Sequence, residues 1–495
     1  MSRPILFGCN MPQGNSKTGQ IVLKLADLLE ALNQPCPSQT TAAIPHAAID
    51  SRQVEAGALF IAIPGEKVDG HDFVGDAFSR GASFALIQHE VLGDFKTLDL
   101  RKKLSQTDLD RLDAPLCLLV ENTLTALQEI ARFWRNKLDL RVVGITGSVG
   151  KSTTKELTAQ ALQSRFRTLK NFGNLNNEIG LPLTILGLRS DHEIAVLEMG
   201  FYVPGEIDFL CQIAKPQIGV VTNIGTVHAE RAGSQEAIAR GKAELVQALP
   251  PAPEGVAILN YDDIRVREMA KMTQARVFFY GLSPEADLWA DKVEGLGLDG
   301  IRFRLHYQHE TLHIHLPLIG RHSVHTALRA TAICLIEGLN WQEIIKGLQA
   351  GHAQLRLVAV RSKCGALILD DTYNASPAST LAALNLLEEM DGKQHIAVLG
   401  DMLELGQYER QSHEMIGLRT AEVADILLTF GKRAHIIAKS ARNAGMPANA
   451  ILEFDEEEPL VEWLKENLAP QDSLLIKGSR GLRMDRITAA LEAEK

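Results

Sequence analysis

The chain has 495 residues, of which 45% are hydrophobic and 23% are charged, and its formal net charge is -10 at pH 7. This length predicts about three domains, and this composition is typical of globular proteins. The negative charge excludes a global basic surface that would attract nucleic acid or an anionic membrane. Anionic ligands must therefore be bound locally, by loops, helix N-termini or metal ions.

The cysteines and the N-terminus both indicate the cytoplasm. The six cysteines are scattered without a Cys-x-x-Cys pair, so we expect reduced thiols. The apolar residues 5–7 are too few for a signal peptide, and no apolar run has the length of a membrane span. We therefore expect a cytoplasmic protein without membrane insertion.

The first part of the chain divides into an extension and a small domain. Residues 1–20 are rich in Gly, Asn and Ser and are predicted to form a flexible extension. Residues 21–119 are predicted to form a small α/β domain, with one helix and two short strands over residues 21–32, 58–64 and 82–88. The charged segment 94–113 lacks apolar periodicity, which predicts a loop or a surface helix.

Residues 120–345 are predicted to form the central domain. Apolar residues at helical spacing predict an amphipathic helix over residues 123–138. A buried strand over residues 141–145 then leads into a glycine-rich loop and a helix. Further strands alternate with helical segments and predict a parallel sheet; they cover residues 194–198, 218–223 and 256–260. Residues 287–317 alternate with period two, which predicts an antiparallel appendage.

Residues 346–495 repeat the α/β alternation. Their predicted strands cover residues 366–370, 396–400, 426–430 and 474–477. This pattern predicts a Rossmann-like doubly wound domain, although no G-x-G-x-x-G motif indicates a dinucleotide. The predicted fold class is therefore α/β, with a small N-terminal domain, a central P-loop parallel-sheet ATPase domain and a C-terminal Rossmann-like domain.

The strongest functional motif is GITGSVGKSTTK, residues 144–155, between a buried strand and a helix. Glycine-rich backbone N–H groups can wrap a phosphate, Lys151 can reach the β- and γ-phosphates, and the Ser152 hydroxyl can bind Mg²⁺. A structural turn with a chance lysine is the alternative, and the strand–loop–helix setting disfavours it. The predicted nucleotide-binding residues here are Thr146, Gly147, Ser148, Val149, Gly150, Lys151, Ser152 and Thr153.

Three residues outside the loop are weaker candidates. Glu198 ends a strand beside the P-loop strand, where a magnesium ligand belongs, although it could also face solvent. His228 follows another strand at the same edge and is either structural or a ligand to metal or substrate. Lys242 lies on a predicted helix over residues 234–248, where a solvated lysine is the ordinary interpretation.

Three loops of the last domain follow strand ends and carry Gly and charged residues. They read DDTYNASP, LGDMLELG and KGSRG. Each alone is compatible with a simple turn. Because the carboxyl ends of parallel strands meet at one edge of a sheet, the three together predict a binding site there.

With residues 50–73 and the segment NFGNLNNEIGLPLTIL at residues 171–186, these motifs resemble the Mur ligase family in their order along residues 50–486. The resemblance implies an ATP-dependent amide ligase of peptidoglycan precursor synthesis. Its nearest members add D-alanyl-D-alanine to UDP-N-acetylmuramoyl-tripeptide through an acyl phosphate. The resemblance also implies a monomer that uses ATP and two Mg²⁺ ions.

The same resemblance implies roles for single residues. Ser152 and Glu198 would bind the first Mg²⁺, and His228 and a carbamylated Lys242 the second. The implied catalytic residues are Lys151, Glu198, His228, Lys242 and Arg356.

Residues of the outer domains also receive roles from the resemblance. Arg356 would reach the γ-phosphate, and Asp371 would contact the ribose or organise the hinge. Ser51 and Arg52 would lie near the UDP group. The residues implied near the peptide substrates are Asn176, Asn177, Lys477 and Arg480.

The chain departs from the family beside the adenine. The common pattern G-x-H-N-x-x-N-A-L reads GRHSVHTAL here, so Ser323 and Thr326 replace two asparagines. The alternatives are another Mur-type ligase, a folylpolyglutamate-type ligase or a regulatory P-loop NTPase. DDTYNASP and LGDMLELG favour the dipeptide-adding ligase, and residues 50–73 have no counterpart in a regulatory NTPase.

Overall fold

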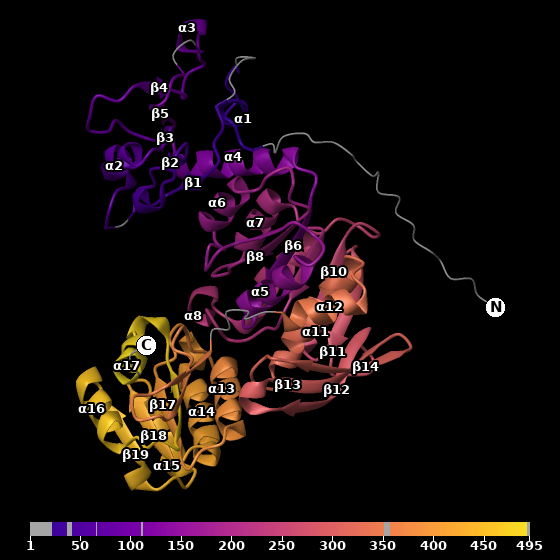
Figure 1. Ribbon diagram of the computed structural model, residues 1–495, viewed down its shortest axis with the longest axis vertical. Coiled ribbons are helices and arrows are strands. Elements are labelled where there is room, and N and C mark those ends of the chain that lie inside the picture. Colours follow the sequence, from indigo (N-terminus) through magenta and orange to yellow (C-terminus); the bar gives the residue numbers. More distant parts are fainter. Residues whose placement is uncertain (1–21, 37–41, 66, 110–111, 351–356, 493–495) are drawn as a thin grey trace, which may run out of the picture.

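The computed structural model describes residues 22–36, 42–65, 67–109, 112–350 and 357–492. The predicted extension, residues 1–20, and the predicted γ-phosphate contact Arg356 lie outside them. Figure 1 shows three lobes in chain order, from the indigo N-terminal lobe through the central lobe to the yellow C-terminal lobe. In the described part of the chain, no helix is both long and apolar enough to cross a membrane.

The N-terminal lobe contains a five-stranded parallel sheet in the order β1-β2-β3-β5-β4. Its strands are β1 (Ala47–Ala48), β2 (Leu59–Ile61), β3 (Phe84–Ile87), β4 (Thr97–Asp99) and β5 (Leu116–Leu119). Its helices are α1 (Leu25–Ala31), α2 (Val74–Ser79) and α3 (Gln106–Leu109). The prediction of a loop or surface helix over residues 94–113 missed β4, because only Leu98 of this edge strand is buried.

The central lobe contains a nine-stranded sheet in the order β14-β13-β12-β11-β10-β9-β6-β8-β7. The first six strands along the chain are β6 (Arg141–Thr146), β7 (Thr168–Lys170), β8 (Ile194–Glu198), β9 (Ile218–Val221), β10 (Val256–Asn260) and β11 (Arg276–Gly281). Neighbouring pairs among them are parallel, which confirms the predicted parallel sheet.

The predicted antiparallel appendage continues this sheet. It consists of β12 (Leu288–Gly295), β13 (Ile301–Tyr307) and β14 (Glu310–Leu316), which pair antiparallel. However, β12 also pairs parallel with β11, so the three strands extend the central sheet instead of forming a separate unit.

Helices cover both faces of the central sheet. They are α4 (Thr123–Lys137), α5 (Lys151–Leu162), α6 (Gly180–Leu186), α7 (Glu206–Ala214), α8 (Ala229–Ala232), α9 (Gln235–Gln247), α10 (Ile264–Glu268), α11 (Ser323–Ile336) and α12 (Trp341–Gln349). Successive residues of β6 enter two different cores, with Val142 in one and Val143 and Ile145 in the other. Strand β6 is therefore buried on both faces, and only its carboxyl end opens toward a ligand.

The C-terminal lobe contains a six-stranded sheet in the order β15-β16-β20-β17-β18-β19. The strands are β15 (Val358–Arg361), β16 (Leu367–Asp370), β17 (His395–Gly400), β18 (Ile426–Phe430), β19 (Ile451–Phe454) and β20 (Ser473–Lys477). The helices are α13 (Pro377–Glu389), α14 (Glu409–Val423), α15 (His435–Asn443), α16 (Glu457–Asn467) and α17 (Asp485–Leu491). The edge strands β15 and β19 were not predicted, because they are largely not buried and so lack a continuous apolar pattern.

Candidate active site

The glycine-rich loop, residues 147–150, is the candidate phosphate loop; it joins β6 to α5 and has the backbone geometry of an anion-binding turn. Gly147 has a φ of +140° and Gly150 a φ of +87°, both in the range that favours glycine. A Cβ on Gly147 would lie 1.8 Å from the Thr222 hydroxyl oxygen. Helix α5 begins at Lys151, so its first-turn N–H groups and the positive end of its dipole lie at this loop.

The carbonyl groups of the loop are bonded to donors of the protein. The Gly147 carbonyl accepts from Lys151 Nζ at 2.8 Å and from Lys242 Nζ at 3.1 Å. The Val149 carbonyl accepts from the Thr222 hydroxyl at 2.7 Å. The Gly150 carbonyl accepts from the Thr154 hydroxyl at 2.6 Å. These bonds engage oxygens that would repel a phosphate.

Some loop donors are also engaged within the protein. The N–H groups of Ser148 and Val149 donate to the Asn223 carbonyl and side-chain oxygens at 2.9 and 3.0 Å. The Thr146 hydroxyl is buried and donates to the Met199 carbonyl at 3.1 Å. The predicted nucleotide-binding residue Thr146 therefore supports the loop from within the core, and the start of α5 is the candidate anion-binding part.

Glu198 lies at the carboxyl end of β8 and is 1% exposed. Its two carboxylate oxygens accept hydrogen bonds from the Ser152 hydroxyl at 2.7 Å and from Asn176 Nδ2 at 2.9 Å. The structure thus brings together three residues that the sequence analysis took from separate motifs. Their hard oxygen atoms form a set suited to Mg²⁺.

Two residues that the sequence analysis did not select hold this arrangement. Asn171 accepts from the Glu198 N–H at 2.9 Å and donates to the Glu198 carbonyl at 3.0 Å. Lys155 is 1% exposed and donates to the Asn171 carbonyl at 2.7 Å and to the Gly173 carbonyl at 3.3 Å. The asparagine-rich segment after β7 was the available signal, because asparagine side chains bond backbone groups in irregular segments.

Lys242 lies on α9 but does not face solvent. It is 1% exposed, and its Nζ lies 4.7 Å from the centroid of the Phe201 ring. Burial, reinforced by the nearby Lys151 charge, holds the pKa of Lys242 well below its usual range. The alternative of a solvated helical lysine therefore does not hold for Lys242, and burial favours the neutral form of its amine.

His228 has a left-handed backbone, with a φ of +66°, and precedes α8. Its Nδ1 lies 2.6 Å from Glu404 Oε2 of the C-terminal lobe, and its ring meets the Tyr202 ring edge-on at 4.8 Å. Burial lowers the pKa of His228, although Glu404 opposes that shift. His228 therefore links the phosphate-loop side of the molecule to the LGDMLELG loop.

A cavity of about 150 Å³ lies between the phosphate loop, the start of α11 and the C-terminal lobe. Its lining residues include Val149, Gly150, Ser152, Thr153, Ser323, Thr326, Asp371 and Lys477. Lys477 is 1% exposed, and its Nζ lies 2.5 Å from Asp371 Oδ2. The structure thus places Lys477 beside the phosphate-loop residues of this cavity, whereas the resemblance implied a place near the peptide substrates.

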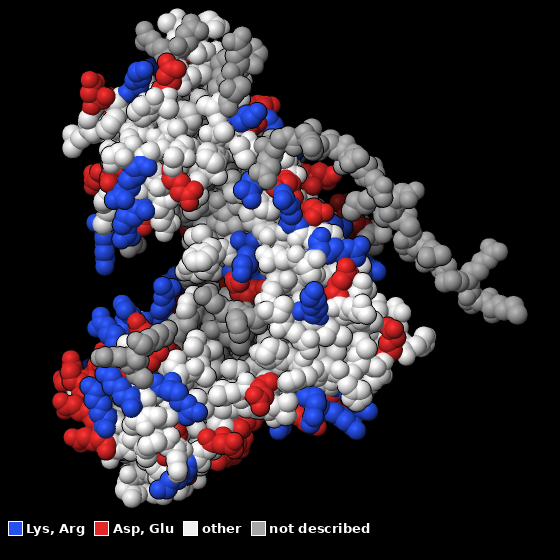
Figure 2. Space-filling model, viewed as in Figure 1, with Lys and Arg blue, Asp and Glu red and all other residues white. Residues whose placement is uncertain are grey.

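A second cavity, of about 260 Å³, adjoins the phosphate loop at Ser148 and Lys151. Central-lobe and C-terminal residues line it together, including Asn176, Glu198, His228, Glu404 and Arg480. The guanidinium carbon of Arg480 lies 5.6 Å from the centroid of the Tyr373 ring. Figure 2 shows the molecule hollowed between its N-terminal and C-terminal lobes, with Lys and Arg side chains on both margins.

Three predicted substrate residues lie apart from this cluster. Asn177 accepts from the Gly180 N–H at 2.9 Å at the start of α6 and lines a separate cavity of about 200 Å³. Ser51 is buried in the N-terminal lobe, whereas the Arg52 side chain is 80% exposed and pairs with Asp50 at 2.7 Å.

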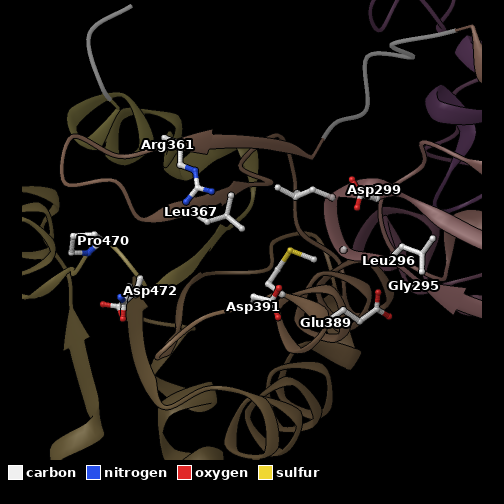
Figure 3. Close-up of a pocket in the computed structure, with 13 residues that line it drawn as sticks. Gly295, Leu296, Asp299, Arg361, Leu367, Glu389, Asp391, Pro470 and Asp472 are labelled. Atoms are coloured by element: carbon white, nitrogen blue, oxygen red, sulfur yellow. The ribbon is translucent and has the colours of Figure 1, made fainter.

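Figure 3 shows another cavity, of about 420 Å³, between the turn after β12 and the C-terminal lobe. It is lined by Leu367, Asp391 and Asp472, which lie at or just before the amino ends of β16, β17 and β20. Ligands of open α/β sheets bind at the carboxyl ends of the strands. This cavity is therefore not the candidate active site.

Comparisons with known proteins agree with this geometry. The chain matches the Mur ligase family, catalytic domain, over residues 44–135, the Mur ligase middle domain over residues 145–334, and the Mur ligase, glutamate ligase domain over residues 355–480. It is 34% identical over 474 residues to the UDP-N-acetylmuramoyl-tripeptide--D-alanyl-D-alanine ligase of Bacillus subtilis, covering 95% of this chain and 98% of that protein. The chain belongs to the Mur ligase family.

Further Mur ligases resemble the chain over most of its length. The ligase of the same name from Synechocystis is 36% identical, covering 90% of this chain and 91% of the relative. A crystal structure of MurF from Acinetobacter baumannii superposes with a TM-score of 0.79 at 30% identity, covering 95% and 99% of the two chains. MurF from Thermotoga maritima in complex with ADP superposes with a TM-score of 0.73 at 28% identity, covering 90% and 96%.

Proposed function

We propose that this Mur ligase adds D-alanyl-D-alanine to UDP-N-acetylmuramoyl-tripeptide, with ATP converted to ADP and phosphate. The names of the relatives support this reaction, and the bound ADP of the Thermotoga maritima structure supports ATP as the phosphoryl donor. The observation that carries the proposal is the cavity where Lys151 and Glu198 of the central lobe meet Arg480 of the C-terminal lobe. A phosphate donor and two peptide substrates can therefore meet at one place.

The chemistry follows from joining a carboxylate to an amine in water, which requires an activated acyl group. The tripeptide carboxylate attacks the γ-phosphate of ATP, which releases ADP and forms an acyl phosphate. The dipeptide amine then attacks the acyl carbon, phosphate leaves, and the amine loses a proton. Enclosure between the lobes keeps water away from the acyl phosphate.

Lys151 and the start of α5 are the proposed polyphosphate-binding elements. Lys151 donates to the Gly147 carbonyl, a neutral acceptor that a phosphate oxygen would outcompete. The amine thus lies at the loop before the nucleotide arrives. We also propose that Gly150, Ser152 and Thr153 bind ATP and that Arg356 contributes from the C-terminal lobe, as the family resemblance implies.

The residues present fit magnesium. Ser152 and Glu198 provide adjacent oxygen donors 2.7 Å apart, and Asn176 orients the second carboxylate oxygen. When bound, Mg²⁺ neutralises phosphate charge and so lowers the barrier to attack by a carboxylate. We propose Ser152 and Glu198 as ligands of one ion, and His228 and a carbamylated Lys242 as ligands of a second.

The environment of Lys242 supports carbamylation, because only a neutral amine reacts with carbon dioxide and the pKa of Lys242 is lowered. A carbamate would provide the oxygen ligands that Mg²⁺ prefers. We expect ¹³C-bicarbonate to yield a protein carbamate NMR signal that is absent in Lys242→Ala. We also expect short carboxylates to restore part of the activity of that variant. Activity indifferent to carbon dioxide removal would contradict carbamylation.

The remaining substrate contacts are proposals from the resemblance and from position. We propose that Asn176 and Arg480 lie at the peptide substrates and that Ser51 and Arg52 bind the UDP group. Asp371 and Lys477 form an ion pair in the cavity beside the phosphate loop, which favours a contact with the nucleotide. We also propose domain limits at residues 21–119, 120–345 and 346–495, a monomer, and a cytoplasmic location.

The decisive experiment is an acceptor panel with coupled detection of ADP and mass analysis of the product. ADP should form rapidly only when UDP-N-acetylmuramoyl-tripeptide and D-alanyl-D-alanine are both present. Lys151→Ala should lower the rate at least about 100-fold, because charge at the transferred phosphoryl group is lost. Lys271→Ala, at an exposed lysine of the central lobe, is the matched control. Ligation of single amino acids instead would indicate another Mur-type or a folylpolyglutamate-type ligase.

A further inference from the structure

Arg329 is a buried charge that the proposed reaction does not yet use. It lies on α11 and is 3% exposed. Its Nε donates to the Thr154 hydroxyl at 2.8 Å, its Nη1 to the Tyr280 hydroxyl at 3.2 Å and its Nη2 to the Thr326 hydroxyl at 2.8 Å. All three acceptors are neutral, and no carboxylate of the described residues forms an ion pair with Arg329.

Another buried arginine, Arg135, shows how such a charge is stabilised structurally. Arg135 is 5% exposed and donates to the carbonyls of Leu138, Leu140 and Ala214 at 2.9–3.0 Å. Leu138 caps the C-terminus of α4 and Ala214 ends α7, so the carbonyls of these two residues lie at the negative ends of two helix dipoles. Arg135 therefore has its counter-charge within the protein.

Arg329 has the opposite surroundings. Its Nη2 lies 2.9 Å from the position that a Cβ on Gly150 would take, at the N-terminus of α5. A helix N-terminus carries positive partial charge, and Lys151 begins the same helix. Arginine stays protonated inside proteins, and a buried charge without an anionic partner is costly. Among the described residues, no carboxylate thus pairs directly with Arg329, although its guanidinium lies against the loop at Gly150.

We propose that Arg329 is a positioning residue for the nucleotide, whose polyphosphate is the counter-charge of the buried guanidinium. This inference rests on nucleotide binding at the phosphate loop, which is part of the proposed function. The guanidinium acts from beneath the loop, because its acceptor Thr154 donates in turn to the Gly150 carbonyl at 2.6 Å. Its acceptor Tyr280 likewise donates to the Thr222 carbonyl at 3.2 Å, and Thr222 bonds Val149. The charge therefore polarises hydroxyl groups that hold the loop.

The same side chain also bonds a residue of α11 that lines the proposed nucleotide cavity. Thr326, which lines that cavity, accepts from Arg329 and replaces an asparagine of the common family pattern. Arg329 thus couples the α11 side of the cavity to the phosphate loop. Because the effect is electrostatic, it grows with ligand charge, so Arg329 favours ATP over ADP and ADP over AMP.

The test is a calorimetric titration of the full chain with ATP, ADP and AMP at constant MgCl₂. Arg329→Gln should weaken ATP binding about tenfold or more and AMP binding less than about twofold, because only the charge-dependent part is lost. Arg329→Lys, which keeps the charge, should bind ATP within about threefold of the wild type. Arg135→Gln is the matched control and should leave the ratio of ATP to AMP affinity unchanged, even if its Tm falls.

If Arg329→Gln weakened the binding of ATP and of AMP by the same factor, Arg329 would have a purely structural role and the proposal would be overturned. Unchanged ATP binding in this variant would also overturn it. If the glutamine variant does not fold, Arg329→Lys carries the test, because this variant must then retain the wild-type ratio of ATP affinity to AMP affinity. These titrations need no acceptor peptide. If the acceptor panel showed no ligation, the role of Arg329 in nucleotide binding could therefore still hold. If Arg329→Gln weakened ATP and AMP binding equally, the proposed ligase reaction could still hold.

Discussion

Among single residues, Glu198 allows the effect of its negative charge to be measured separately from the effect of its hydrogen bonds. Ser152 and Asn176 donate to its two oxygens, and Asn171 holds its backbone. We predict that Glu198→Gln folds normally but needs at least about tenfold more Mg²⁺ for half-maximal ligation, because the amide keeps the shape and loses the negative charge. Magnesium titrations of the rate measure this, with the exposed Glu254→Gln as control. An unchanged titration would exclude Glu198 as a ligand.

The phosphate loop is the element where backbone geometry limits substitution. Gly147→Ala would place a Cβ 1.8 Å from the Thr222 hydroxyl oxygen at a φ of +140°. We predict a stability loss of about 1–3 kcal/mol, with loss of ATP binding, because the loop must shift to admit the methyl group. Gly338 also has a positive φ, of +77°, but no atom lies within 4 Å of the Cβ that an alanine would add. Gly338→Ala therefore measures the backbone strain without the clash. If both variants bound ATP like the wild type, the assigned loop would be wrong.

The turn before α2 provides a pH prediction in the N-terminal lobe. Asp69 accepts from the His71 N–H at 3.0 Å, and this bond is the main cause that lowers the pKa of Asp69 from 3.8 to about 2. Because the folded pKa is depressed, the carboxylate stabilises the fold fully above 3.8, and this stabilisation is lost as the pH falls through about 2.

We therefore predict that Asp69→Asn lowers the free energy of unfolding at pH 6 and that the difference from the wild type narrows as the pH falls below 3.8. Urea unfolding at a series of pH values measures the difference. Asp72→Asn, at an exposed neighbouring carboxylate, is the matched control. A constant difference across the series would mean that Asp69 acts through packing instead of charge.

In the whole molecule, the proposed nucleotide cavity lies between two lobes that make polar contacts with each other. His228 meets Glu404 at 2.6 Å and Arg321 meets Glu389 at 3.1 Å, while Asp371 and the phosphate loop line one cavity. A ligand there contacts both lobes. We predict that ATP at 100 times its Kd stabilises them together by about 2.7 kcal/mol.

Differential scanning calorimetry tests this coupling. With ATP and magnesium, the transitions of the central and C-terminal lobes should move upward together, whereas Lys151→Ala should show no shift at the same concentration. Movement of the central transition alone would mean that the nucleotide does not bridge the lobes.

Local patterns in the sequence were sufficient to predict much of the fold and the strands and helix around the candidate site. The sequence analysis predicted three elements correctly: the strand before GITGSVGKSTTK, the helix that follows this motif, and the strand that ends at Glu198. Short runs of apolar residues and the spacing of glycines are sufficient to predict such elements, because both are local features of the sequence. The edge strands β4 and β15 were missed, because their pairing depends on partners distant in the chain.

The sequence by itself determined the α/β alternation, the phosphate loop and the family, since each depends on residue type at short spacing. Only the tertiary structure decided that Lys242 is buried, that Lys477 pairs with Asp371, and that Asn171 and Lys155 hold Glu198. It also decided that Arg329 lies against the loop and forms no ion pair with a described carboxylate. The physical reason is that burial and counter-charge are properties of neighbours in space, and the folded chain brings those neighbours from different elements.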